Sequence, residues 1–182
     1  MLKNSWLKLF LIIVLVLLSV GSAGKASYLS GKAWLAQCLL NHAWSQSESS
    51  GDPIKPWPWA DIHPVAKLII PRLNKTQIVL ESHSSEAMAF GPGLIQRDNS
   101  FFLAGHRDSH FAFLSQLVIG DSVELRMPNG ESHSATIQAI EIIDTEKQKE
   151  ISIPDNSIIL LTCYPFNAVR AGGPLRYVAV VY

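Results

Sequence analysis

The chain has 182 residues, 15 acidic and 15 basic residues, and two cysteines, Cys38 and Cys163. This length suits one domain with an appendage. A net charge of zero provides no basic field for nucleic acid, and two cysteines so far apart do not form a disulfide framework.

The N-terminal segment, residues 1–25, predicts a single membrane-spanning helix. Sixteen uncharged residues separate Lys8 from Lys25, and a helix of that length spans roughly 24 Å. The hydrocarbon core of a bilayer is about 30 Å thick, and lysine side chains can reach the headgroups across the difference. The alternative is a cleaved signal peptide, because residues 21–23 are small. Both interpretations export the rest of the chain, and Lys3 and Lys8 favour a cytoplasmic N-terminus.

Residues 26–44 predict a second helix, with an apolar stripe at helical spacing that includes Leu40 and Ala43. Cys38 lies inside this segment, where we expect a packed thiol. The helix either lies on the membrane or packs on the following domain. The polar segment 45–56 contains Pro and Gly and predicts a linker.

Residues 57–182 predict one β domain. Apolar and β-branched runs separated by turn residues indicate at least seven strands, a pattern typical of a sandwich or barrel. Short helices are expected at 85–90 and 109–117. The predicted strands are 65–73, 76–81, 100–105, 121–127, 133–143, 157–163 and 176–182.

Three side chains at the ends of these strands suggest covalent catalysis. Cys163 ends an apolar strand, where side chains reach solvent, and a thiol is a nucleophile only as the thiolate. His106 follows the apolar strand 100–105, so the two strands could bring a cysteine and a histidine together. Arg176 opens the last strand, thirteen residues after Cys163, where a guanidinium could hold a carbonyl or an oxyanion.

Neighbouring polar residues have weaker assignments. Thr162 and Asp108 are candidate substrate-binding residues; Thr162 could orient substrate or the loop, and Asp108 could orient His106. Arg107 and Arg170 are expected to be surface or substrate-rim charges.

No metal site and no cofactor are expected. His106 and His110 have a helical metal-ligand spacing, but no third ligand cluster is near them in the sequence. Acidic residues such as Asp144 and Glu146 lack the spacing of a calcium loop.

The combination of motifs resembles the sortases, cysteine transpeptidases of bacterial surfaces. "LLTCYPF" at 160–166 is similar to their cysteine signature, "AGHRD" at 104–108 to their histidine motif, and "LRYVAV" at 175–180 to their arginine strand. The resemblance covers residues 57–182, and "PWPWAD" with "TCYPF" most resembles the proteobacterial group. It implies a closed β-barrel of about eight strands with short helices.

The resemblance also implies a reaction and its partners. Cys163 would attack an LPxTG-like sorting signal of an exported protein, Arg176 would steady the peptide or oxyanion, and His106 would transfer protons. An amine acceptor would resolve the thioester. The enzyme would be a monomeric, single-pass protein of the inner membrane with its catalytic domain on the periplasmic side.

A second class of function is an exported β-barrel binding module in which Cys163 is inert. The reactivity of the thiol separates this module from an enzyme. A papain-like protease fits less well, because its nucleophile precedes its histidine along the chain.

Overall fold

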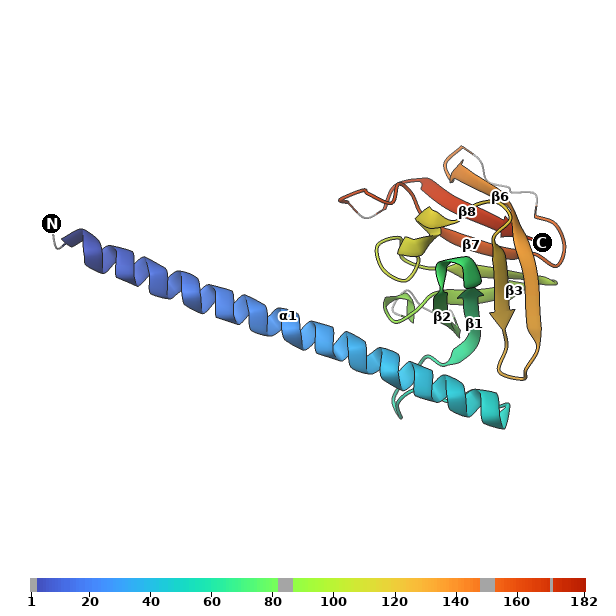
Figure 1. Ribbon diagram of the computed structural model, residues 1–182, viewed down its shortest axis with the longest axis horizontal. Coiled ribbons are helices and arrows are strands. Elements are labelled where there is room, and N and C mark those ends of the chain that lie inside the picture. Colours follow the sequence, from blue (N-terminus) through green and yellow to red (C-terminus); the bar gives the residue numbers. More distant parts are fainter. Residues whose placement is uncertain (1–2, 82–86, 148–152, 171) are drawn as a thin grey trace. The chain divides into compact units, whose positions relative to one another are not determined.

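The protein is represented by a computed structural model that describes residues 3–81, 87–147, 153–170 and 172–182 (Figure 1). In these residues a long helix precedes a set of strands, and short 3-10 helices lie in the connections. The elements are α1 (Lys3–Ser50), β1 (Pro64–Ile70), β2 (Lys75–Glu81), β3 (Gly93–Arg97), β4 (Ser100–Ala104), β5 (Ser122–Arg126), β6 (Ser132–Asp144), β7 (Ile158–Cys163) and β8 (Leu175–Val181), with 3-10 helices at Pro71–Leu73, Ala87–Ala89 and Ala112–Gln116.

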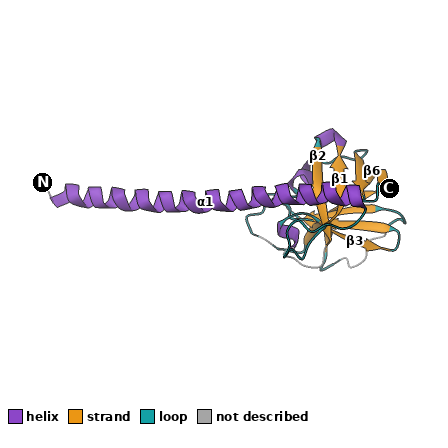
Figure 2. Cartoon of the chain, turned by 90° about the horizontal axis from the view of Figure 1, so that it is seen from below, coloured by secondary structure: helices purple, strands orange, loops and turns teal. Residues whose placement is uncertain are grey.

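The helix α1 is unbroken (Figure 2) and is long and apolar enough to cross a membrane. The sequence predicted separate helices at 1–25 and 26–44 and a linker from residue 45, whereas residues 45–50 continue the helix. The division of this region into anchor, juxtamembrane helix and linker stays a prediction.

The end of α1 has a local physical cause. The first proline of the chain is Pro53, so no residue before it lacks the N–H that a helix requires. Gly51 has a φ of 78° and its N–H donates to the carbonyl of Ser47 at 2.8 Å. A glycine in this left-handed conformation is a common helix terminator.

The last turns of α1 pack on the barrel. Leu40 and Trp44 are buried in one cluster with Ile62 and Leu80, which belong to the β1–β2 region. The ammonium group of Lys67 lies 4.8 Å from the centroid of the Trp44 ring, within cation–π distance. Of the two alternatives for this helix, packing on the domain therefore holds for its last turns.

Cys38 is exposed, so the expectation of a packed thiol is wrong. Helical residues are about 100° apart around the axis, which puts Cys38 about 200° from the buried Leu40. The apolar stripe of the helix therefore does not include the thiol.

The strands form a closed barrel in the order β1-β2-β3-β4-β7-β8-β6-β5. The β2–β3 and β4–β7 pairs are parallel, and the other pairs are antiparallel. Alternate side chains fill the interior, as β1 illustrates with Ala66, Leu68 and Ile70. Each fully buried Leu or Ile stabilises the fold by about 1.5–3 kcal/mol. The closed eight-stranded barrel confirms the predicted fold class.

Each of the seven predicted strands overlaps an observed one, and β3 is an addition. Only Gly93 of β3 is buried, so this strand shows little of the apolar pattern that identified the others. The predicted short helices correspond to the 3-10 helices at Ala87–Ala89 and Ala112–Gln116, while residues 85 and 86 lie outside the described residues.

Candidate active site

The strand order brings three sequence-predicted residues to one end of the barrel. The strand β7 lies between β4 and β8 (Figure 1), so Cys163 at its end has a neighbour on either side. In the antiparallel β7–β8 ladder, Cys163 is the direct partner of Arg176. The Cβ atoms of such a pair lie about 5 Å apart.

The register of the parallel β4–β7 ladder leads toward His106 and Cys163. That ladder pairs Phe101 with Ile158 and ends at the pair of Ala104 and Leu161. His106 follows Ala104 by two residues, and Cys163 follows Leu161 by two residues. The N–H of Gly105 still donates to the carbonyl of Leu161 at 3.3 Å, which extends the contact by one step toward the histidine.

The alternation of side chains assigns Cys163 and Arg176 to the outer face of the barrel. Ile159 and Val178 form an apolar cluster that is separate from the barrel interior. Cys163 shares the side of β7 that carries Ile159, and Arg176 shares the side of β8 that carries Val178. His106 stands in the loop two residues beyond the end of β4.

Thr162 ties the cysteine strand to the histidine loop. It is 3% exposed, and its hydroxyl donates to the carbonyl of Gly105 at 2.7 Å. Its polar atom is thus directed at the residue before His106. Of the two roles predicted for Thr162, this geometry favours orientation of the loop.

The histidine loop folds back through a close contact at Gly105. A Cβ at this position would lie 2.9 Å from the Phe111 ring, too close for any side chain without a shift. The N–H of Phe111 donates to the carbonyl of His106 at 3.0 Å, and Phe111 is fully buried in the core. A buried aromatic ring therefore fixes the turn in which His106 stands exposed.

Arg107 differs from the sequence prediction of a surface charge. It is 7% exposed, and its Nη2 atom donates to the carbonyl oxygens of Ala168 and Arg170, the first at 3.2 Å and the second at 2.5 Å. Its Nη1 atom is buried and has no hydrogen-bond partner among the described residues. The two carbonyls hold the guanidinium inside the protein, where it connects the histidine loop to the β7–β8 loop. Arg170 itself is exposed, as predicted.

Arg176 is half-buried, and backbone carbonyls of the residues just before it hold its guanidinium. Its Nη1 atom donates to the carbonyls of Gly173 at 2.6 Å and Leu175 at 2.9 Å. The next residue, Tyr177, points into the core, and burial raises the pKa of its hydroxyl to about 12. Tyr177 stays protonated at neutral pH and cannot serve as a base there.

The described residues contain no cluster of three or more His, Cys, Asp or Glu side chains that could hold a metal ion. Asp108 is exposed and makes no hydrogen bond to His106 in the described structure. His110 is the second histidine of the metal-ligand spacing noted in the sequence. Its Nε2 atom lies 3.3 Å from the carbonyl oxygen of Ala89.

Comparison with known proteins identifies the family of this chain. The family model for the sortase domain matches residues 68–181. Sortase D of Bacillus subtilis is 29% identical over 119 residues, which are 61% of this chain and 59% of that protein. The chain therefore spans less than two thirds of the length of this relative.

Solved structures show the same fold at low sequence identity. Sortase A from Corynebacterium diphtheriae is 18% identical with a TM-score of 0.54, and the match covers 68% of this chain and 62% of that one. A lid mutant of that enzyme is 18% identical with a TM-score of 0.56 and coverage of 80% and 91%. Sortase A of Listeria monocytogenes is 20% identical with a TM-score of 0.55 and coverage of 65% and 85%.

Proposed function

The chain belongs to the sortase family, and we propose that it is a membrane-anchored cysteine transpeptidase in which Cys163, His106 and Arg176 carry out the reaction. The observation that carries this proposal is the register of three adjacent strands. Cys163 pairs with Arg176, and the β4–β7 ladder leads toward His106 on its other side.

The reaction follows from the chemistry of these groups. The Cys163 thiolate attacks the carbonyl carbon of a peptide bond, and His106 donates a proton to the amine as the carbon–nitrogen bond breaks. The acyl group remains on sulfur as a thioester. An acceptor amine then attacks the thioester, His106 takes the amine proton, and the sulfur leaves as thiolate.

Arg176 stabilises the oxyanion that forms in both steps. The carbonyls of Gly173 and Leu175 hold its Nη1 atom, and its backbone is paired with that of Cys163. The Nε and Nη2 donors then remain for the substrate. Donors fixed before the reaction stabilise developing charge without the cost of reorganisation.

Thr162 and Arg107 act as positioning residues behind this site. The Thr162 hydroxyl holds the backbone of the histidine loop, and Arg107 holds the carbonyls of Ala168 and Arg170 in the β7–β8 loop. Asp108 remains a candidate for contact with substrate because it is exposed beside His106.

The substrate in this proposal is the LPxTG-like C-terminal sorting signal of an exported protein, and the acceptor is an amine. The enzyme would act as a monomeric thiol protease of the proteobacterial sortase group. Residues 1–25 would anchor it in the inner membrane, with the N-terminus in the cytoplasm and residues 57–182 on the periplasmic side. The apolar character of α1 supports the anchor.

Cleavage of a fluorogenic LPxTG-like peptide by the detergent-solubilised full chain tests the reaction. The wild type should release the fluorophore and form a covalent acyl adduct that mass spectrometry locates at Cys163. Cys163→Ala should abolish both signals and leave the fold intact, because removal of one sulfur from a partly exposed site leaves at most a small cavity. Cys38→Ala is the matched control and should retain activity. Cleavage by Cys163→Ala would overturn the assignment.

Thiol alkylation shows whether an absence of cleavage comes from an unsuitable test peptide or from an inert Cys163. Cys38 is exposed and would react too, so the measurement uses the Cys38→Ala chain. An activated Cys163 should react with iodoacetamide rapidly at neutral pH even if the chosen peptide is not cleaved. A Cys163 that reacts only in denaturant would instead favour the binding module.

A further inference from the structure

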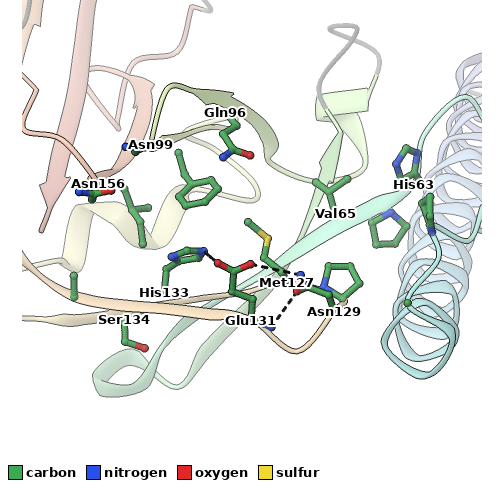
Figure 3. A pocket seen from close by; sticks show the side chains of 17 residues that line it. His63, Val65, Gln96, Asn99, Met127, Asn129, Glu131, His133, Ser134 and Asn156 are labelled. Atoms are coloured by element: carbon green, nitrogen blue, oxygen red, sulfur yellow. Dashed lines mark hydrogen bonds and ion pairs between the residues drawn. The ribbon is translucent and has the colours of Figure 1, made fainter.

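A pocket of about 820 Å³ lies toward the other end of the β4–β7 ladder (Figure 3). Phe101 and Ile158, the first pair of that ladder, line it. They precede His106 and Cys163 by five residues each, or about 16 Å at 3.3 Å per residue. None of the residues assigned to the reaction lines this pocket.

Carboxamide side chains from three separate connections surround the pocket, which we call the amide pocket. Gln96 and Asn99 come from the end of β3 and the β3–β4 turn, Asn129 from the β5–β6 turn, and Asn156 from the segment before β7. Figure 3 shows Gln96, Asn99 and Asn156 on one side of the hollow and the β5–β6 residues on the other. A carboxamide has two N–H donors and an acceptor oxygen. The oxygen of Asn129 already accepts from the N–H of Glu131 at 3.0 Å, so Gln96, Asn99 and Asn156 are the main carboxamides for a ligand.

The described lining of the amide pocket has few charged groups. No Lys or Arg belongs to that lining, and its one carboxylate is Glu131. The Nε2 atom of His133 lies 3.2 Å from a Glu131 oxygen, and the amide of Asn129 donates to the other oxygen at 3.5 Å. A phosphate would find no lysine or arginine here, and a cationic ligand would compete with the contacts that Glu131 already makes.

The floor of the pocket is apolar. The ring centroids of Phe101 and His133 lie 4.7 Å apart, and Met127 and Ile158 also line the hollow. Carboxamides around an apolar floor suit a ligand that has polar groups at its edge and carbon–hydrogen faces above and below.

An extended peptide is the alternative occupant of this pocket. The register of β2 and β3 covers only Gly93 and Leu94 of β3, so Gln96 lies beyond that pairing. Main-chain pairing with this short strand edge would give a peptide affinity without selecting for carboxamides. The carboxamides therefore favour a ligand that is recognised through polar groups at its edge.

We propose that the amide pocket binds a neutral saccharide that carries acetamido groups. The N–H and C=O of an acetamido group point in opposite directions, so carboxamides on two different segments can bind it together, one accepting from its N–H and one donating to its oxygen, and the acetamido methyl can rest on the apolar floor. Ring hydroxyls supply donors and acceptors for the remaining carboxamides. This binding does not depend on the transpeptidase reaction.

Saturation-transfer NMR with N,N′-diacetylchitobiose tests the proposal on the full chain in a detergent without a sugar headgroup. The wild type should transfer saturation most strongly to the acetamido methyl groups. Asn99→Ala combined with Asn156→Ala should weaken binding at least tenfold, because it removes carboxamides from two connections. Gln138→Ala is the matched control, since Gln138 is an exposed carboxamide of β6 that does not line the pocket. Equal binding by the double variant would overturn the proposal.

Two further ligands define what the pocket recognises. Cellobiose lacks the acetamido groups and should bind more weakly than chitobiose, so equal binding would contradict the acetamido assignment. If a neutral extended peptide binds and chitobiose does not, the proposal of a saccharide ligand is wrong.

Failure of this proposal can be distinguished from failure of the proposed reaction. Cys163→Ala should bind chitobiose as the wild type does. The Asn99/Asn156 double variant in the Cys38→Ala background should keep the alkylation rate of Cys163. A lost alkylation rate in that variant would show that the pocket is not a separate site.

Discussion

The two ends of the β4–β7 ladder carry side chains of opposite chemical character. One end presents a thiol, an imidazole and a guanidinium, all able to carry or exchange charge, on Cys163, His106 and Arg176. The other end presents the neutral carboxamides of the amide pocket and a contact of 3.2 Å between His133 and Glu131. The same hydrogen-bonded strands support both.

The difference suggests how the fold could separate the proposed reaction from the proposed saccharide binding. At the reactive end, main-chain carbonyls hold Arg107 and Arg176, and neither has a carboxylate partner among the described residues. In the proposed reaction the charge of Arg176 is therefore not cancelled and acts on the oxyanion. At the pocket end the described lining has no Lys or Arg and one carboxylate, which leaves hydrogen bonding as the main means of selection.

His106→Gln gives the largest expected effect on this comparison. It should lower kcat/KM for peptide cleavage by about 10²–10⁴-fold, because the leaving amine loses its proton donor. The wild type should show a bell-shaped pH dependence of kcat/KM, since the reaction needs thiolate and imidazolium together, and one limb should disappear in the variant. Chitobiose binding should not change. An unaltered pH profile would remove His106 from the mechanism.

Arg176→Lys comes next and tests whether geometry or charge matters at the reactive end. Lysine keeps the charge and loses the planar fork of donors. We expect kcat/KM to fall by about 10²–10³-fold, the usual cost of one oxyanion donor. Arg170→Ala is the matched control, because this exposed arginine lies in the adjoining loop and should have little effect. The reverse ranking would move the catalytic guanidinium to Arg170.

Much of the fold was predictable because short apolar and β-branched runs between turn residues mark the strands. The strand β1 also alternates, with Ala66, Leu68 and Ile70 buried, whereas β7 and β8 are recognisable as nearly continuous apolar runs. The strand β3 was not predicted because, of its residues Gly93–Arg97, only the glycine is buried. Its strand conformation depends on hydrogen bonds to the neighbouring strands β2 and β4. The continuous helix through residues 45–50 was missed because polar residues there favoured a linker, although no proline interrupts them.

The reactive end was predictable from residue type and position at strand ends, but its supports were not. Arg107 stands in a polar stretch of sequence, and only the folded chain brings it to Ala168 and Arg170, more than sixty residues away. The amide pocket was missed for a related reason. Its carboxamides are spread over one strand end and three connections, and each alone is an ordinary polar residue of such a segment.

Arg107→Gln should have a smaller effect than the changes at His106 and Arg176. It removes the guanidinium that holds the β7–β8 loop, and a looser loop should raise KM about tenfold with a smaller change in kcat, in line with a contact worth about 1.4 kcal/mol. Arg107→Lys should restore part of the loss, because an ammonium can reach one of the two carbonyls. A change in kcat alone would mean that Arg107 acts on the reacting atoms and not through the loop.

Asp121→Asn should have the smallest effect on peptide cleavage and on chitobiose binding, because Asp121 stabilises the fold and belongs to neither site. This buried carboxylate accepts hydrogen bonds from the Arg72 guanidinium and from the N–H of Val118 at 2.9 Å. The hydrogen bonds from Arg72 hold the pKa of Asp121 below its usual range. A carboxyl group with a depressed pKa stabilises the folded state above its unfolded pKa, and that contribution disappears as the pH falls through the folded pKa.

We therefore expect Asp121→Asn to lower the free energy of unfolding by about 1.5–3 kcal/mol at pH 7, the range for hydrogen bonds to charged groups. Urea unfolding should show this difference shrinking below about pH 4, near the ordinary pKa of aspartate. Glu141→Gln is the control, because Glu141 is exposed on β6. A difference independent of pH would mean that shape rather than charge matters at Asp121. The folded Asp121→Asn variant should keep both peptide cleavage and chitobiose binding although it is less stable. In that case a general loss of stability cannot explain the activity lost in the His106 and Arg176 variants or the binding lost in the Asn99/Asn156 variant.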